Sequence, residues 1–305
     1  MIWRVEFDET GTPEALHWRE AELAPPAEGE VTITVKAASV NPIDAKIRAG
    51  RLPPLPLSFP ATSGRDGMGV ITALGQGVPA HHLGQRVAFL APRGAVGTWA
   101  TALNLPVAIV SNVPEAVPDL TAAALPLAGL SALAVVNLTE PAGKSLLVHG
   151  GAGGVGRLAI QLARLQGANV QATASARNHA ALQSLGASKV WSYDEGPPPL
   201  KGLDAVIDLI GGATHQASYA MLRKGGILAC LNADPFTDNS AAHGIDLRMA
   251  EVAPDPAALS HLLDLVAQGK LNAAPTQFLP IQDFAKAHRL IEEGAVSGKL
   301  VLDFT

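Results

Sequence analysis

A strand that runs directly into a glycine-rich turn and then a helix is the feature that most constrains this chain. The apolar run Leu146–Val148 leads through His149 into the loop Gly150–Gly156. Within that loop three glycines match G-x-G-x-x-G, a spacing that permits a tight turn, a close backbone approach to a pyrophosphate, and close packing of helix on strand. The helix N-terminus that follows favours anions. The loop therefore predicts a dinucleotide site formed by Gly151, Ala152, Gly153, Gly154, Val155 and Gly156.

The residues after the loop support this interpretation, because a glycine-rich turn alone often does no more than turn the chain. Apolar residues recur at helical spacing between Val155 and Ala163, and Gly167 suits a C-terminal cap. Residues 169–174 then read as a second strand. Strand, loop, helix and strand together form one βαβ unit.

The end of the second strand indicates which dinucleotide is bound. In an NAD site, Asp or Glu about 20 residues past the glycines holds the ribose 2′-hydroxyl. Here no carboxylate lies between Glu140 and Asp194, and the strand is followed by Ser175 and Arg177. A hydroxyl and a guanidinium suit a 2′-phosphate. The sequence predicts NADPH, with the alternative that Arg177 is a solvated residue that starts the next helix.

Composition and charge limit the partners. The net charge is −5 and the charged residues are scattered, so neither nucleic acid nor an anionic membrane is expected to bind. Residues 1–7 alternate like a strand rather than a signal peptide, and no apolar run reaches the roughly 20 residues of a spanning helix. The single cysteine, Cys230, excludes an internal disulfide and a cysteine-rich zinc site. We expect a cytoplasmic enzyme that acts on a small molecule.

Three segments with different patterns indicate an α/β fold. Residues 1–120 are rich in short strands broken by Pro and Gly, which predicts a β-rich domain. In residues 121–253 strands and helices alternate, which predicts a doubly wound parallel sheet. Residues 254–305 hold two helical patterns and a closing strand, and we expect this segment to return to the first domain.

Six short motifs follow one another along nearly the whole chain. They are Asn41–Asp44 with Arg48 and Gly50, Gly64–Val70, Leu125–Ala132, Val148–Gly156, Asp204–Gly212 and Gly298–Leu302. In this order they resemble the zinc-free quinone oxidoreductase group of the medium-chain dehydrogenase/reductase superfamily. The resemblance implies a GroES-like N-terminal domain, a Rossmann domain and a homodimer.

The resemblance also implies a reaction without catalytic zinc. Zinc-dependent members of the superfamily have Cys where Asn41 stands and Gly-His-Glu where Gly64–Asp66 stands. Without those ligands no metal site is expected, and hydride delivery to a conjugated acceptor is the chemistry that remains. We expect a reductase of quinones or α,β-unsaturated carbonyls. The alternative is a noncatalytic NADPH-binding structural or redox-sensor protein.

Several further site residues are implied by the resemblance. Asn41 and Ser131 are the predicted catalytic residues, beside the alternatives of a turn former and a helix-interior serine. Further cofactor contacts are expected from Tyr193, Leu231, Asn232 and Lys299, although Tyr193 and Lys299 also suit exposed positions. Asp44 and Arg48 are expected to cap a helix and to pair with each other at i, i+4.

Overall fold

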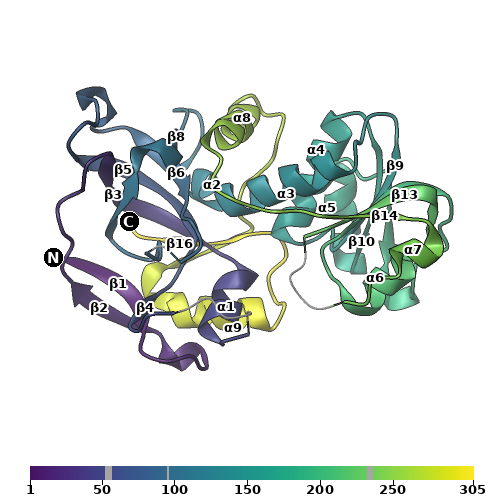
Figure 1. Ribbon diagram of the computed structural model, residues 1–305, viewed down its shortest axis with the longest axis horizontal. Coiled ribbons are helices and arrows are strands. Elements are labelled where there is room, and N and C mark those ends of the chain that lie inside the picture. The colour runs from purple at the N-terminus through teal and green to yellow at the C-terminus, as the bar shows by residue number, and fades with distance from the viewer. Residues whose placement is uncertain (52–56, 95, 232–235) are drawn as a thin grey trace. The chain divides into compact units, whose positions relative to one another are not determined.

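Two compact units make up the described part of the chain (Figure 1). The computed structural model describes residues 1–51, 57–94, 96–231 and 236–305. One unit comprises Met1–Leu127 together with Ala253–Thr305, and the other comprises Ala128–Val252. The sequence predicts the two divisions after residues 120 and 253.

The first unit is built on two sheets, as the β-rich prediction requires. The smaller sheet has the order β2-β1-β4, and the larger has the order β15-β16-β3-β5-β6-β8, with β7 also paired to β3. The strands are β1 (Ile2–Phe7), β2 (His17–Ala21), β3 (Glu30–Val40), β4 (Ala61–Thr62), β5 (Asp66–Leu74), β6 (Arg86–Leu90), β7 (Ala102–Pro106), β8 (Val110–Asn112), β15 (Gln277–Pro280) and β16 (Leu300–Asp303). Its helices are α1 (Pro42–Arg48), α2 (Asp119–Ala124), α8 (Pro256–Ala267) and α9 (Phe284–Glu292).

Strand β3 is the central element of the larger sheet. Val31, Ile33 and Val35 are buried, whereas the residues between them are half-buried, so one face of the strand supplies the core. Its C-terminal half pairs antiparallel with β16, Val40 opposite Leu300 and Ala37 opposite Asp303. The strand near the C-terminus therefore completes a sheet that begins in the first forty residues.

The second unit is the predicted doubly wound sheet. Its six strands are parallel in the order β11-β10-β9-β12-β13-β14, and the order reverses between β9 and β12. These strands are β9 (Ser145–His149), β10 (Asn169–Ala174), β11 (Lys189–Ser192), β12 (Leu203–Asp208), β13 (Leu222–Cys230) and β14 (Asp246–Met249). The helices are α4 (Gly154–Leu165), α5 (His179–Ser184), α6 (Gly212–Tyr219), α7 (Ser240–His243) and most of α3 (Pro126–Leu138). In sheets of this type ligands bind at the carboxyl ends of the strands, where the order reverses.

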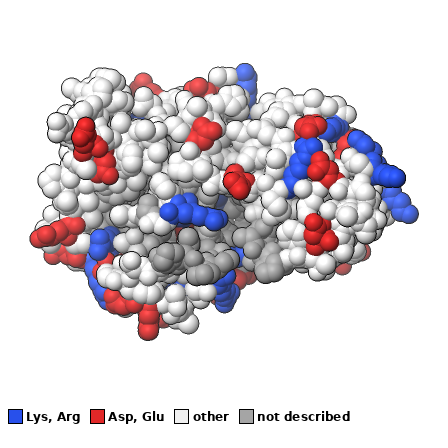
Figure 2. Space-filling model, in the orientation of Figure 1, with Lys and Arg blue, Asp and Glu red and all other residues white. Residues whose placement is uncertain are grey.

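Surface charge and helix length are relevant to the expectation that the protein binds neither nucleic acid nor a membrane. On the described part of the face drawn in Figure 2, acidic and basic side chains are intermixed rather than gathered in one field. Among the described residues, no helix is long and apolar enough to cross a membrane.

Candidate cofactor and active site

The glycine loop joins β9 to α4, as the sequence predicts. Gly150 has a φ of 75°, in the left-handed region that glycine tolerates, and it turns the chain out of the strand. A Cβ on Gly156 would lie 2.2 Å from the carbonyl oxygen of Gly150, so only glycine lets the helix pack this closely on the loop. Gly153 is the N-cap of the twelve-residue α4, and it supplies no side-chain cap.

This loop fits a pyrophosphate. The first N–H groups of a helix have no partner within the helix, and a glycine N-cap leaves them for a ligand. The loop also follows β9, which lies next to the point where the strand order reverses. The cradle that a dinucleotide needs is therefore present in the second unit.

Three predicted residues gather at one end of β10 and β11. Ala174 pairs with Ser192 across these parallel strands, so Ser175 and Tyr193 are the next residues of neighbouring strands. Ser175 is half-buried and accepts a 2.9 Å hydrogen bond from Nδ2 of Asn178, whereas Arg177 and Tyr193 are exposed. These side chains lie at the same edge of the sheet as the glycine loop, because β9 and β10 also run parallel.

The remaining predicted contacts fall in different places. Leu231 is half-buried and follows β13, with its N–H 3.4 Å from the carbonyl oxygen of Asp208. Asn232 lies outside the described residues. Ser131 is buried within α3 in the second unit, and Lys299 is buried in the first unit.

Asn41 belongs to a buried polar network in the first unit. Its amide nitrogen donates to Asp66 Oδ1 at 2.8 Å, to Ser39 Oγ at 3.1 Å and to Asp44 Oδ2 at 3.4 Å. Its amide oxygen accepts a 2.6 Å bond from Lys299 Nζ. Because an ammonium only donates, this bond fixes the orientation of the amide. We call Ser39, Asn41, Asp44, Asp66 and Lys299 the Asn41 network.

Elements far apart in sequence build this network. Ser39 lies near the end of β3, Asp66 starts the paired strand β5, and Lys299 precedes β16. Lys299 Nζ also donates to Ser39 Oγ at 3.0 Å and to the carbonyl oxygen of Val40 at 3.3 Å. Ser39 Oγ donates to Asp66 Oδ1 at 2.5 Å. All five residues are buried, so the network is rigidly held.

Burial shifts the pKa values of Asp44 and Lys299 in the network. It raises the pKa of Asp44 to about 7, and the negative charge of Asp66 adds to this effect. Burial lowers the pKa of Lys299, while the carboxylates of Asp66 and Asp44 oppose that change. Asp44 Oδ1 has no hydrogen-bond partner among the described residues, which suits a protonated or partly protonated carboxyl.

The structure corrects one expected pair. Asp44 does cap α1, since its Oδ2 accepts a 2.8 Å bond from the N–H of Asn41, but Arg48 does not bind it. The Arg48 guanidinium binds Glu292, the carbonyl oxygen of Gly11 at 2.6 Å, and His288 Nδ1 at 3.2 Å. Helix α9 packs against α1 and supplies better-placed partners than the i, i+4 neighbour does.

Sequence reasoning missed the parts of the network that depend on strand pairing. No pattern in the sequence points to Ser39, and Asp66 stands where zinc-dependent members of the superfamily have Glu. Asp66 is fully engaged, because its Oδ2 accepts a 2.8 Å bond from the N–H of Leu127 and its Oδ1 accepts two further bonds. A catalytic zinc does not fit this network, where the ammonium of Lys299 is the buried cation.

Comparison with known proteins identifies the family. Residues 27–115 match the alcohol dehydrogenase GroES-like domain, and residues 185–302 match the zinc-binding dehydrogenase family. A probable quinone oxidoreductase of Schizosaccharomyces pombe is 31% identical over 98% of this chain and 96% of its own length. The chain belongs to the quinone-oxidoreductase-like group of the medium-chain dehydrogenase/reductase superfamily.

Solved structures of quinone oxidoreductases have the same fold. The Coxiella burnetii enzyme superposes with a TM-score of 0.90 at 30% identity, covering 100% of this chain and 99% of that one. The Escherichia coli quinone oxidoreductase complexed with NADPH has a TM-score of 0.88 at 28% identity, covering 99% of each chain. The predicted GroES-like and Rossmann architecture is confirmed.

One group of relatives is much longer. A mycocerosic acid synthase-like polyketide synthase of Mycobacterium tuberculosis is 30% identical over 98% of this chain. The chain spans 15% of the length of that synthase.

Proposed function

We propose that this protein is an NADPH-dependent reductase that transfers a hydride to a quinone or another α,β-unsaturated carbonyl without catalytic zinc. One observation carries the proposal. The carboxyl ends of β10 and β11 offer Ser175, Arg177 and Tyr193, where an NAD site would use a carboxylate. Asp194 and Glu195 follow Tyr193, but Asp194 Oδ2 accepts a bond from Ser192 Oγ within its own turn.

In the proposed site the cofactor is held by the residues that the sequence predicts. The glycine loop holds the pyrophosphate, and Ser175, Arg177 and Tyr193 hold the 2′-phosphate. Leu231, Asn232 and Lys299 remain predicted contacts. The E. coli relative solved with NADPH supports the same choice of nucleotide.

Bound NADPH supplies the hydride in this proposal. The chain holds the acceptor in register and stabilises the negative charge that grows on the carbonyl oxygen. We assign this second task to Asn41, with Ser131 as a further donor. The two Nδ2 hydrogens of Asn41 are shared among three hydrogen-bond acceptors of the protein. We propose that the longest of these bonds, 3.4 Å to Asp44 Oδ2, is replaced by a bond to the carbonyl oxygen of the substrate. Solvent supplies the final proton.

The experiment is a turnover assay with NADPH oxidation as the readout. The panel contains 1,4-quinones, short enones and a conjugated thioester, each with NADPH and with NADH. We expect turnover with NADPH on at least one acceptor class. Binding of NADPH with no turnover on any acceptor would support the second candidate, a noncatalytic NADPH-binding sensor.

Zinc independence has a separate test. Turnover is measured with and without a strong chelator, together with the metal content of the same samples. We expect unchanged rates. A rate that falls in proportion to the zinc removed would overturn this part of the proposal.

The proposal includes a homodimer. Strand β14 is one of the two edge strands of the parallel sheet, and Met249 at its end is 44% exposed, although a side chain of this size is usually better covered. Light scattering after gel filtration measures the mass. A single-chain mass at assay concentration would exclude the dimer.

A further inference from the structure

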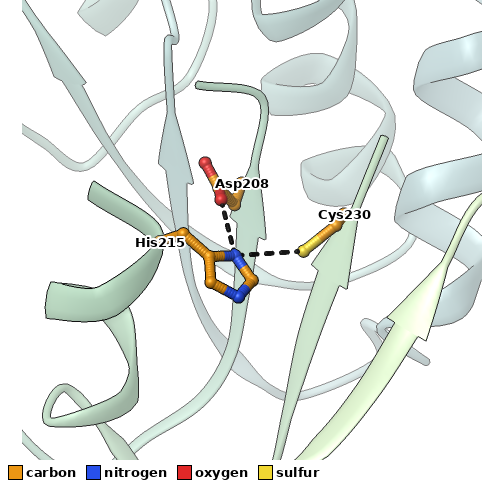
Figure 3. Close-up of side chains that lie close together, drawn as sticks. All are labelled: Asp208, His215 and Cys230. Atoms are coloured by element: carbon orange, nitrogen blue, oxygen red, sulfur yellow. Dashed lines mark hydrogen bonds and ion pairs between the residues drawn. The ribbon is translucent and has the colours of Figure 1, made fainter. Parts of the chain in front are cut away.

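Three side chains that can ligate a metal meet in the second unit. Asp208 ends β12 and Cys230 ends β13, and the two residues are paired in register across these parallel strands. His215 comes from α6, the helix that connects the two strands. Figure 3 shows the carboxylate, the imidazole and the thiol directed toward one another. One ligand atom of each lies within 4.8 Å of the other two.

The distances are close to those of a metal site. Nδ1 of His215 lies 3.0 Å from Asp208 Oδ2 and 3.7 Å from Cys230 Sγ. Zinc bonds of about 2.0 to 2.3 Å place the ligand atoms of a tetrahedral site roughly 3.3 to 3.8 Å apart. Small side-chain rotations would therefore bring the three atoms around one ion.

The outer contacts leave one atom of each side chain for the ion. Asp208 Oδ1 accepts bonds of 2.9 Å from the N–H groups of Ile210 and Gly211, which turns Oδ2 toward His215. The other ring nitrogen of His215, Nε2, lies 2.9 Å from the hydroxyl of Tyr219. Support of this kind, on the far atom of a carboxylate and of an imidazole, is typical of metal ligands.

The position of the proton between Tyr219 and His215 also bears on metal binding. The Tyr219 hydroxyl accepts a 3.2 Å hydrogen bond from the N–H of Asn239. It donates a 3.5 Å hydrogen bond to Asp238 Oδ1. It has one proton, so when that proton goes to Asp238, His215 must donate from Nε2. Nδ1 then presents a lone pair to the Asp208 carboxylate, which also has only lone pairs. Either a proton on Nδ1 or a metal cation between those two atoms resolves the contact, and the buried thiol of Cys230 at 3.7 Å from Nδ1 supplies a further metal ligand.

Burial and charge favour a doubly charged ion. Asp208, His215 and Cys230 are each 1% exposed or less. A dication with one carboxylate, one thiolate and one neutral imidazole gives a site with no net charge, which a buried position tolerates. A thiolate and an imidazole select zinc-like transition metals, whereas magnesium and calcium prefer oxygen alone.

We propose that Asp208, His215 and Cys230 bind one zinc-class divalent transition-metal ion that fastens α6 to β12 and β13. Binding releases the thiol proton of Cys230 to solvent and forms the metal–sulfur bond. The sequence predicts no metal, because the zinc ligands of relatives that it lacks, at Asn41 and at Gly64–Asp66, lie in the first unit. The three donors are separated by 7 and 15 residues, which matches no familiar zinc spacing.

The test uses cobalt as the probe. The full chain is produced in minimal medium that contains Co²⁺ in place of zinc, washed with a chelator, and analysed for metal content and absorption. We expect about one cobalt per chain and a thiolate-to-cobalt charge-transfer band in the near ultraviolet. Cys230→Ala should lose both the band and most of the cobalt. Tyr219→Phe should keep the band but weaken binding by about 10- to 100-fold, as loss of a supporting contact does.

The matched control addresses surface histidines. His81 and His82 lie side by side, with ring centroids 4.3 Å apart, and they can hold a metal adventitiously. The double variant His81→Ala/His82→Ala should keep the cobalt and the band. A wild-type chain that holds no cobalt would overturn the proposal. So would cobalt that gives no thiolate band and is retained in Cys230→Ala. The cluster would then be a hydrogen-bonded contact with the proton on His215 Nδ1.

Discussion

The Nζ atom of Lys299 lies 2.6 Å from the Oδ1 atom of Asn41, and this bond decides that the Asn41 amide nitrogen faces Asp66. A residue that precedes the last strand therefore orients a residue at the start of the first helix. Without the ammonium, the amide could turn over, and its oxygen would then face carboxylates. The orientation of Asn41 and the presence of Lys299 should be energetically coupled.

The first prediction concerns that coupling. Asn41→Ala should lower turnover by about 10- to 1000-fold, because we assign to Asn41 the stabilisation of the acceptor oxygen, while the affinity for NADPH changes much less. Lys299→Met should lower turnover in the same direction, and the double variant should be much less than additive. Steady-state kinetics on the best acceptor measures all three. Asn112→Ala, an exposed asparagine on β8, is the control. Wild-type rates in Asn41→Ala would remove Asn41 from the mechanism.

The second prediction concerns the cofactor. NADPH should bind at least about tenfold more tightly than NADH, and Arg177→Ala should weaken NADPH alone by about 10- to 100-fold, the value of one charge-assisted contact. Fluorescence titration with both nucleotides gives the dissociation constants. Arg223→Ala, at the opposite end of the sheet on β13, serves as the control. Equal loss of affinity for both nucleotides would show that Arg177 does not read the 2′-phosphate.

The third prediction follows from Asp44. Its pKa is raised from 3.8 to about 7 in the folded chain, so the native carboxyl holds its proton to a higher pH than the unfolded one does. The stability from this group is present below the unfolded pKa and is lost as the pH rises toward the folded value. Asp44→Asn should reduce the fall in the free energy of unfolding between about pH 4.5 and about pH 7.5. Urea unfolding at both pH values tests this, and an unchanged slope would contradict it.

The fourth prediction concerns the stability of the protein at acidic pH. Burial lowers the pKa of His288 from 6.5 to about 3 and that of His149 to about 4. Both residues are neutral in the native chain, so stability should fall as the pH drops below the unfolded value, where the unfolded chain gains protons. His288→Gln keeps an acceptor for Arg48 and should make the acid limb of the stability profile shallower. Combining it with His149→Gln should flatten that limb further, and no change in either variant would exclude these histidines as its cause.

The features of the fold that could be predicted depend on residues that are close together in the sequence. The glycine loop, the alternation along β3 and the order of strands and helices in the second unit all depend on residues close in sequence, and they predicted the fold. Placing Ser175 and Tyr193 at one edge required only that β10 and β11 be parallel neighbours. The partners of Asn41 could not be predicted in this way, because Asp66 and Lys299 reach it only when β3 pairs with β5 and β16.

The same limit applies to Arg48 and to Cys230. For Arg48 the sequence offers Asp44 one turn away, but the packing of α9 against α1 brings Glu292 and His288 into contact with it. The apolar residues beside Cys230 in the sequence predict only that it is buried in the core. Its contact with His215 depends on the return of α6 over β12 and β13, which periodicity does not reveal.

The discontinuity of the first unit has a consequence for synthesis on the ribosome. Residues 128–252 form a unit that is continuous in sequence, so it can fold while the chain is still being made. The first unit must wait, since β16 takes its place beside β3 only after the residues between Val40 and Leu300 have been joined. Until then the end of β3 is an open strand edge, and Ser39 and Asn41 lack the hydrogen bonds that Lys299 donates to them. A nascent chain of this protein should therefore expose the edge of β3 longest, and chaperones should bind it there.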